Sequence, residues 1–225
     1  MNKTFIIIPA YNETEVIAST IRPLLERGYE VVVVDDGSSN NMQEHIKQLN
    51  VHYLRHEINL GQGAALQTGM EYVKKFNPEY VVHFDADGQH SSDDIDEFIN
   101  ILIEKKTDIV LGSRFLTNET KELVPLKRRL LLKTARILNW IFTGLLLTDA
   151  HNGFRVMKGT VLSKLRLTET RMAHATEILR LIKKNRLSYT EAPAKISYTA
   201  YSMQKGQKAS NSVNILIDLV FHRFI

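Results

Sequence analysis

Short apolar runs alternate with longer amphipathic stretches in the first half of the chain, and this alternation restricts the fold more than any other feature. The apolar runs cover residues 5–8, 31–34, 51–54, 80–84 and 109–111. The stretches between them carry apolar residues at helical spacing and cover residues 15–27, 42–49, 64–75 and 93–105. Because parallel strands need a crossover connection, this pattern predicts an α/β fold with a mainly parallel sheet and helices on both faces.

Composition and charge exclude several classes of function. The 225 residues, 44% of them hydrophobic, can bury one sizeable core, so we expect a single domain. The net charge of +4 is small beside 29 basic and 25 acidic residues, so charge alone decides nothing about nucleic acid. We expect no nucleic-acid partner. The absence of cysteine excludes disulfides and thiolate metal sites. The first apolar run ends at Pro9 without the features of a signal peptide, which predicts a cytoplasmic protein.

Polar and glycine-containing segments directly follow four of the predicted strands, at residues 9–13, 35–38, 85–90 and 112–114. The carboxyl ends of parallel strands meet at one edge of a sheet, where ligands bind in such folds. Ordinary turn and helix N-cap residues would explain any single one of these junctions equally well. Their repetition at four strand ends predicts a binding site along this edge.

The segment at 85–90 carries the most specific chemistry. Asp85 and Asp87 follow an apolar strand with one residue between them, so both carboxylates can turn toward one hard divalent cation, Mg²⁺ or Mn²⁺. Gln89 is a candidate third ligand. Such a cation neutralises the charge of a departing diphosphate. The alternative is a solvated turn that caps the following helix.

Three further segments are weaker on their own. Asp36 can accept hydrogen bonds from a ribose or a base imide, although Asp-Gly turns are common. Tyr11 can stack near a base, or belong to a plain turn before a helix. Residues 59–65 open a helix with small residues that permit close approach of a ligand, as an ordinary helix N-terminus also would.

In this order, the segments resemble the family 2 glycosyltransferases of the GT-A fold. The resemblance is strongest to the dolichyl-phosphate mannosyltransferase-like branch, which glycosylates polyprenyl phosphates. The matching segments are PAYNE at 9–13, VDDGS at 34–38, NLGQGAA at 59–65, DADGQH at 85–90, GSR at 112–114 and NGFR at 152–155.

The resemblance implies a nucleoside-diphosphate sugar as donor, a bound Mg²⁺ or Mn²⁺, and a lipid phosphate as acceptor. The residues that it implies for the nucleotide are Pro9, Ala10, Tyr11, Glu13, Val34, Asp36, Gly63 and the loop lysine Lys205. Those that it implies for the metal and diphosphate are Asp85, Ala86, Asp87 and Gln89. For the acceptor they are Arg114, Arg128 and Arg155, since arginine binds phosphate oxygens bidentately.

Two positions depart from the branch. Thr199 stands where the branch usually has an arginine, and Leu132 where it often has a serine. Lys195, Lys208 or Arg171 could compensate for the missing cation. Because of these departures, one alternative stays open: the chain is a non-catalytic subunit that binds a sugar nucleotide.

The predicted reaction is an inverting single displacement in which an acceptor oxygen attacks the anomeric carbon. A lipid phosphate is already an anion and needs no base, whereas a saccharide hydroxyl must lose its proton. Asp149 is the candidate catalytic base for the saccharide alternative, or a plain turn residue. A nucleotidyltransferase or a dinucleotide-dependent oxidoreductase fits less well, because no glycine-rich loop follows the first strand.

We expect residues 1–115 to form a nucleotide-binding half and residues 116–225 an acceptor-binding half of the one domain. Residues 127–147 are basic first and apolar afterwards, with Trp140 at the polar border, and 209–225 are similarly apolar. These two segments are candidate amphipathic helices that lie on a membrane surface, dock on a small membrane-protein partner or pack on the core. We therefore expect peripheral attachment to the cytoplasmic face of a membrane. The sequence leaves the oligomeric state open.

Overall fold

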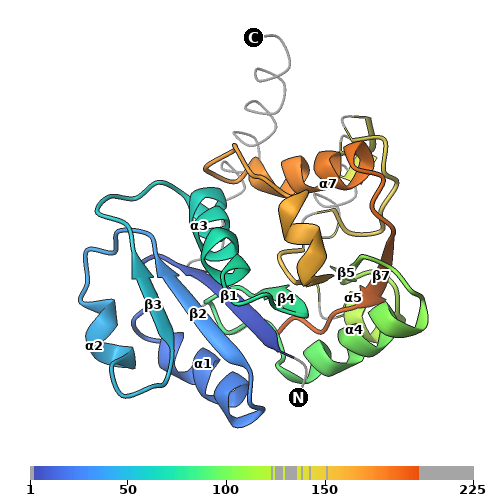
Figure 1. The fold of residues 1–225 in the computed structure, drawn as a ribbon. Coiled ribbons are helices and arrows are strands. Elements are labelled where there is room, and N and C mark those ends of the chain that lie inside the picture. Colours follow the sequence, from blue (N-terminus) through green and yellow to red (C-terminus); the bar gives the residue numbers. More distant parts are fainter. Residues whose placement is uncertain are drawn as a thin grey trace.

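The computed structural model describes residues 3–122, 124, 129, 136–137, 139–141, 143–150 and 152–197. Its strands form one sheet in the order β3-β2-β1-β4-β6-β5-β7 (Figure 1). The strands are β1 (Thr4–Ala10), β2 (Glu30–Asp35), β3 (His52–Arg55), β4 (Tyr80–His83), β5 (Ile109–Ser113), β6 (Arg155–Lys158) and β7 (Tyr189–Pro193). The five predicted strands are therefore confirmed.

The sheet is parallel except around β6, which runs antiparallel to both β4 and β5. In this register His83 on β4 lies beside Arg155 on β6. The insertion of β6 brings residues 152–154, which directly precede it, to the edge where the parallel strands end. Segments from both halves of the chain thus meet at that edge.

Helices cover both faces of the sheet, as predicted (Figure 1). One face packs on α1 (Ile17–Glu26), α2 (Met42–Ile46) and α4 (Asp93–Glu104). The other packs on α3 (Gln62–Lys74), the 3₁₀ helix η1 (Gly159–Ser163) and α7 (His174–Lys184). A short helix, α5 (Asn118–Glu122), follows β5. Both faces of the sheet are thus shielded, which is why its central strands consist of apolar residues without alternation.

Among the described residues between 136 and 146, several apolar side chains are exposed and polar side chains are buried. Residues 136–137, 139–141 and 143 are helical. Ile137, Trp140, Ile141 and Leu146 are 49–60% exposed, whereas Asn139 is buried. Asn139 Nδ2 donates a hydrogen bond to the buried Thr143 Oγ1. These four apolar side chains are exposed, whereas Leu145 and Leu147 of the same segment are buried in the core, so packing on the core describes only part of the segment.

No helix within the described ranges is both long and apolar enough to cross a bilayer. Several predictions lie outside those ranges: the roles of Arg128 and Lys205, the departures Leu132 and Thr199, the compensating Lys208, and the helix expected at 209–225.

Candidate active site

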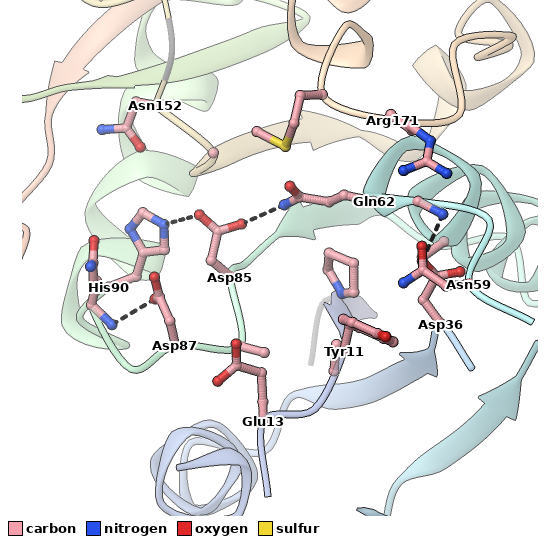
Figure 2. Close-up of a pocket in the computed structure, with 18 of the residues that line it drawn as sticks. Tyr11, Glu13, Asp36, Asn59, Gln62, Asp85, Asp87, His90, Asn152 and Arg171 are labelled. Atoms are coloured by element: carbon pink, nitrogen blue, oxygen red, sulfur yellow. Dashed lines mark hydrogen bonds and ion pairs between the residues drawn. The ribbon is translucent and has the colours of Figure 1, made fainter. Parts of the chain in front are cut away.

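One pocket of about 580 Å³ lies at the carboxyl ends of the parallel strands. Its size is that of a cavity for a small-molecule ligand. The predicted site residues that line it are Pro9, Ala10, Tyr11, Glu13, Asp36, Asp85, Ala86, Asp87, Gln89 and Arg114. The structure therefore gathers residues from four strand ends around a single cavity (Figure 2).

Hydrogen bonds connect the turn after β1 to the turn after β2. Asn12 has a φ of 56°, a left-handed conformation that asparagine tolerates better than most residues. Its backbone N–H donates to Ser38 Oγ, and its Oδ1 accepts from the Ser39 N–H. This turn leaves Tyr11 46% exposed on the pocket wall, where its ring can lie against a planar ligand.

The two aspartates at the end of β2 make different contacts. Asp35 is fully buried and accepts from the Ser38 N–H and the Tyr53 hydroxyl, so it holds the turn. Asp36 lines the pocket, and its Oδ2 accepts from the Gly61 N–H at 2.7 Å. The other oxygen, Oδ1, accepts from the Leu60 N–H and from His56 Nδ1. Asp36 thus joins the β2 turn to the start of α3 and presents its carboxylate at the pocket wall.

Asp85 and Asp87 follow β4 and line the same cavity. Asp85 accepts from Gln62 Nε2 and from His90 Nε2, each at 3.0 Å. Asp87 accepts from the Gln89 backbone N–H at 3.1 Å. Figure 2 shows the Asp85 carboxylate between His90 and Gln62, with Asp87 nearer to Glu13.

The two carboxylates have opposite pKa shifts. Burial would raise the pKa of Asp85, but the hydrogen bond and charge of His90 and the charge of Arg155 outweigh it and lower that pKa. Burial and the nearby charge of Asp85 raise the pKa of Asp87 to about 6. The pair therefore concentrates negative charge that a bound cation would relieve.

Asp85, Asp87 and Gln89 can supply part of the ligand set of a divalent metal. Within the described ranges, no group of three or more His, Asp or Glu side chains is placed to hold a metal ion. Two carboxylates with the Gln89 amide oxygen suit Mg²⁺ or Mn²⁺, which is commonly bound by one or two carboxylates together with substrate phosphates and water. The pocket walls are thus suited to a metal that arrives with a diphosphate.

A buried ion pair forms the end of the pocket beside β5. Arg114 Nε and Nη2 donate to Asp149 Oδ2 and Oδ1 at 2.5 and 2.7 Å. The Arg114 backbone N–H also donates to Asp149 Oδ2, at 3.1 Å. The Asp149 side chain is 1% exposed, so a catalytic base at this position would have to abandon its bidentate arginine. The structure thus places the Asp149 carboxylate against Arg114, and the role of Asp149 as a catalytic base stays a prediction.

Three other predicted site residues lie off the pocket wall. Val34 is fully buried in the core between the sheet and α3. Gly63 packs so closely on the 167–173 loop that an added Cβ would lie 2.0 Å from the Glu169 carbonyl oxygen. Arg155 is 3% exposed, and burial lowers its pKa to about 10. Arg155 interacts electrostatically with Asp85 and Asp149, and its contact with the acceptor stays a prediction.

Several lining residues were not among the predicted site residues: Asn59, Gln62, His90, Asn152, Gly153, Arg171, Met172 and Ile196. The first five stand inside the sequence segments that carry the family resemblance. Three lining residues lie outside those segments, and only the folding of the chain brings them to the pocket: Arg171, Met172 and Ile196. Of these, Arg171 was considered only as a compensating cation. The other compensating candidate among the described residues, Lys195, is exposed and pairs with Glu119.

Comparison with known proteins gives three consistent likenesses. The model of glycosyl transferase family 2 matches residues 5–166. The UDP-N-acetylglucosamine–dolichyl-phosphate N-acetylglucosaminyltransferase of Methanococcus voltae is 31% identical over 98% of this chain and 94% of its own. The polyprenol monophosphomannose synthase of Mycolicibacterium smegmatis is 27% identical over 74% of this chain and 65% of its own.

Among solved structures, glucosyl-3-phosphoglycerate synthase of Mycobacterium tuberculosis, in complex with Mn²⁺, UDP and glucosyl-3-phosphoglycerate, superposes with a TM-score of 0.62. The match covers 97% of this chain and 80% of that one, at 17% sequence identity. This likeness confirms the expected GT-A fold.

Proposed function

The chain belongs to glycosyl transferase family 2 and is a glycosyltransferase, and from this premise we propose its substrates: a nucleoside-diphosphate sugar as donor and a polyprenyl phosphate as acceptor. The observation that carries the proposal is the single pocket that joins Tyr11 and Asp36, the Asp85–Asp87 pair and Arg114. The two relatives named for transfer to dolichyl phosphate or for polyprenol monophosphomannose synthesis support the acceptor class.

The donor lies along the pocket from the β1 and β2 turns to the β4 turn. Tyr11 packs on the base, and Asp36 accepts a hydrogen bond from the base or ribose. Asp85, Asp87 and Gln89 hold a divalent cation, which when bound offsets the negative charge that develops on the departing diphosphate. The two carboxylates thus place the leaving group at one end of the cavity.

The acceptor phosphate lies at the Arg114 end of the pocket. Asp149 holds the Arg114 guanidinium in one orientation, so little side-chain freedom is lost when the arginine meets a phosphate. A phosphate oxygen attacks the anomeric carbon while the bond from that carbon to the diphosphate breaks, with inversion. The acceptor is already an anion, so no proton has to be removed. This agrees with the engagement of Asp149 in an ion pair.

The acceptor class can be tested with radiolabelled sugar nucleotides. A thermal-shift panel of UDP-, GDP- and dTDP-sugars with Mn²⁺ first identifies the donor, because a ligand that binds the folded chain raises its apparent stability. The labelled donor is then offered to polyprenyl phosphate and to a saccharide. We expect a labelled lipid. Transfer only to the saccharide would overturn the acceptor class, and binding without any transfer would indicate a non-catalytic subunit.

We also propose that the chain attaches peripherally to the cytoplasmic face of a membrane through a surface patch formed by Ile137, Trp140, Ile141 and Leu146. Residues 137, 140 and 141 share one face of a helix because they are spaced by three and four positions. The preceding residues 127–136 contain five cations in the sequence: Lys127, Arg128, Arg129, Lys133 and Arg136. An exposed apolar face next to basic residues suits an anionic lipid surface.

Flotation with anionic vesicles tests this attachment. The Trp140→Glu and Leu146→Glu variants should float less than the parent chain, because each places a charge in the patch. Ile103→Glu is the matched control: Ile103 is 50% exposed but lies on α4, outside the patch. Equal flotation of all four proteins would exclude a direct role for the patch and favour a membrane-protein partner.

A further inference from the structure

The Asp85 carboxylate is held by elements far apart in the sequence. Gln62 Nε2, at the start of α3, donates to its Oδ1, and His90 Nε2 donates to its Oδ2. A carboxylate only accepts, so both neighbours act as donors and the His90 tautomer at this contact carries its proton on Nε2. Figure 2 shows the two donors approaching the carboxylate from opposite sides.

The backbone at Gly153 lies against a third side of the Asp85 carboxylate. A Cβ added at this position would lie 2.3 Å from Asp85 Oδ2 and 2.9 Å from both Cγ and Oδ1. These distances are well inside van der Waals contact. A side chain at position 153 would therefore clash with the Asp85 carboxylate and force it to shift.

The donor on the Oδ2 side is itself fixed by packing. The His90 ring stacks on Phe154 at a centroid distance of 5.3 Å and meets Phe84 edge-on at 5.4 Å. Its side chain is 4% exposed, and its backbone pairs with Ile196 in an isolated bridge. The direction of the His90 N–H is thus set by the hydrophobic core.

We propose that Gln62, His90 and Gly153 are positioning residues that fix the orientation of Asp85 toward the divalent cation. This inference rests on the metal site of the proposed function. A carboxylate offers about four lone-pair sites, and the two donors occupy one on each oxygen. One site on each oxygen remains for a cation. Outer-shell hydrogen bonds of this kind typically contribute 10- to 100-fold to metal affinity.

The test measures Mn²⁺ affinity of the full chain by calorimetry in the presence of UDP, without reference to turnover. His90→Phe keeps a ring between Phe84 and Phe154 but removes the donor, and Gln62→Met keeps the length of the side chain but removes the amide. We expect each variant to bind Mn²⁺ at least 10-fold more weakly. Their thermal midpoints and their affinity for UDP in EDTA should match those of the parent chain.

Two exposed residues on α2 provide matched controls. His45→Phe and Gln43→Met make the same chemical changes away from the pocket and should leave Mn²⁺ affinity unchanged. Gly153→Ala gives an independent test, because it displaces Asp85 without removing either donor. It too should weaken Mn²⁺ binding by at least 10-fold, and it carries the test if His90→Phe does not fold.

The outcomes separate this inference from the proposed function. Folded Gln62→Met and Gly153→Ala proteins that bind Mn²⁺ as tightly as the parent chain would overturn the positioning roles alone. A parent chain that binds UDP but no Mn²⁺ would instead overturn the metal site of the proposed function, and the positioning roles with it.

Discussion

The buried pair of Arg114 and Asp149 allows a quantitative prediction about stability. Their side chains are 6% and 1% exposed, so the guanidinium charge is almost completely removed from water. In Asp149→Leu, Arg114 loses both side-chain hydrogen bonds and its counter-charge, and Arg155 loses a favourable charge nearby. Loss of one partner from a buried pair costs about 3–5 kcal/mol. That is a large part of a typical unfolding free energy of about 5–15 kcal/mol.

The matching prediction concerns both partners together. In the double variant Arg114→Met with Asp149→Leu, neither member of the pair is left as an unpaired buried charge, so much of the stability lost at Arg114 should return, while Arg155 still lacks the charge of Asp149. Urea unfolding of the parent chain, both single variants and the double variant gives the coupling energy. As a control, Glu44→Gln breaks the exposed pair with Lys47 and should cost less than about 1 kcal/mol. A loss below about 1 kcal/mol in Asp149→Leu would refute the reasoning, as would a double variant no more stable than the singles.

Further predictions concern pH, packing and the donor. Burial lowers the pKa of His83 to about 3 and of His174 to about 4, so both stay neutral in the folded chain while unfolded imidazoles are protonated below about pH 6.5. The contribution of these two histidines to the unfolding free energy should therefore be complete above that pH and fall toward pH 4, by up to about 1.4 kcal/mol per pH unit for each histidine. Urea unfolding at several pH values should show a flatter slope for His83→Phe. An unchanged slope would contradict the neutral state of His83. An alanine at Gly69 would place its Cβ 2.4 Å from Ile7 Cγ2, so Gly69→Ala should lower the unfolding free energy by about 1–3 kcal/mol from overpacking, and an unchanged thermal midpoint would count against this. Tyr11→Ala should weaken nucleotide binding roughly 10-fold in calorimetry through loss of base packing, whereas equal affinity would remove Tyr11 from the site.

The sequence predicts the first half of the fold well because its strands are buried on both faces. Runs such as residues 31–34 are apolar without interruption, and the helices between them have clear apolar spacing. β6 and β7 have no such signal. β7 contains Glu191, whose carboxylate accepts from the Thr148 N–H, so a tertiary contact accommodates a charge that interrupts the strand pattern.

The donor side of the site was predictable for a related reason. Its residues directly follow predicted parallel strands, so the topology alone brings Tyr11, Asp36 and Asp85 together. The acceptor side depends on long-range pairing. Nothing local indicates that Asp149 meets Arg114 or that the 167–173 loop carries Arg171 to the pocket. The burial of Arg155 was not predicted, because a segment resemblance does not reveal which way a strand residue points.

The most direct test of the account is metal-dependent transfer of a labelled sugar to polyprenyl phosphate. The purified chain is incubated with the donor chosen by thermal shift, first in EDTA and then with increasing Mn²⁺, beside Asp85→Asn and Asp87→Asn. We predict a labelled lipid that forms only with Mn²⁺ and that falls at least 100-fold in either variant, since each removes a charge from the cation site. Equal transfer in EDTA, or full activity in both variants, would contradict the account.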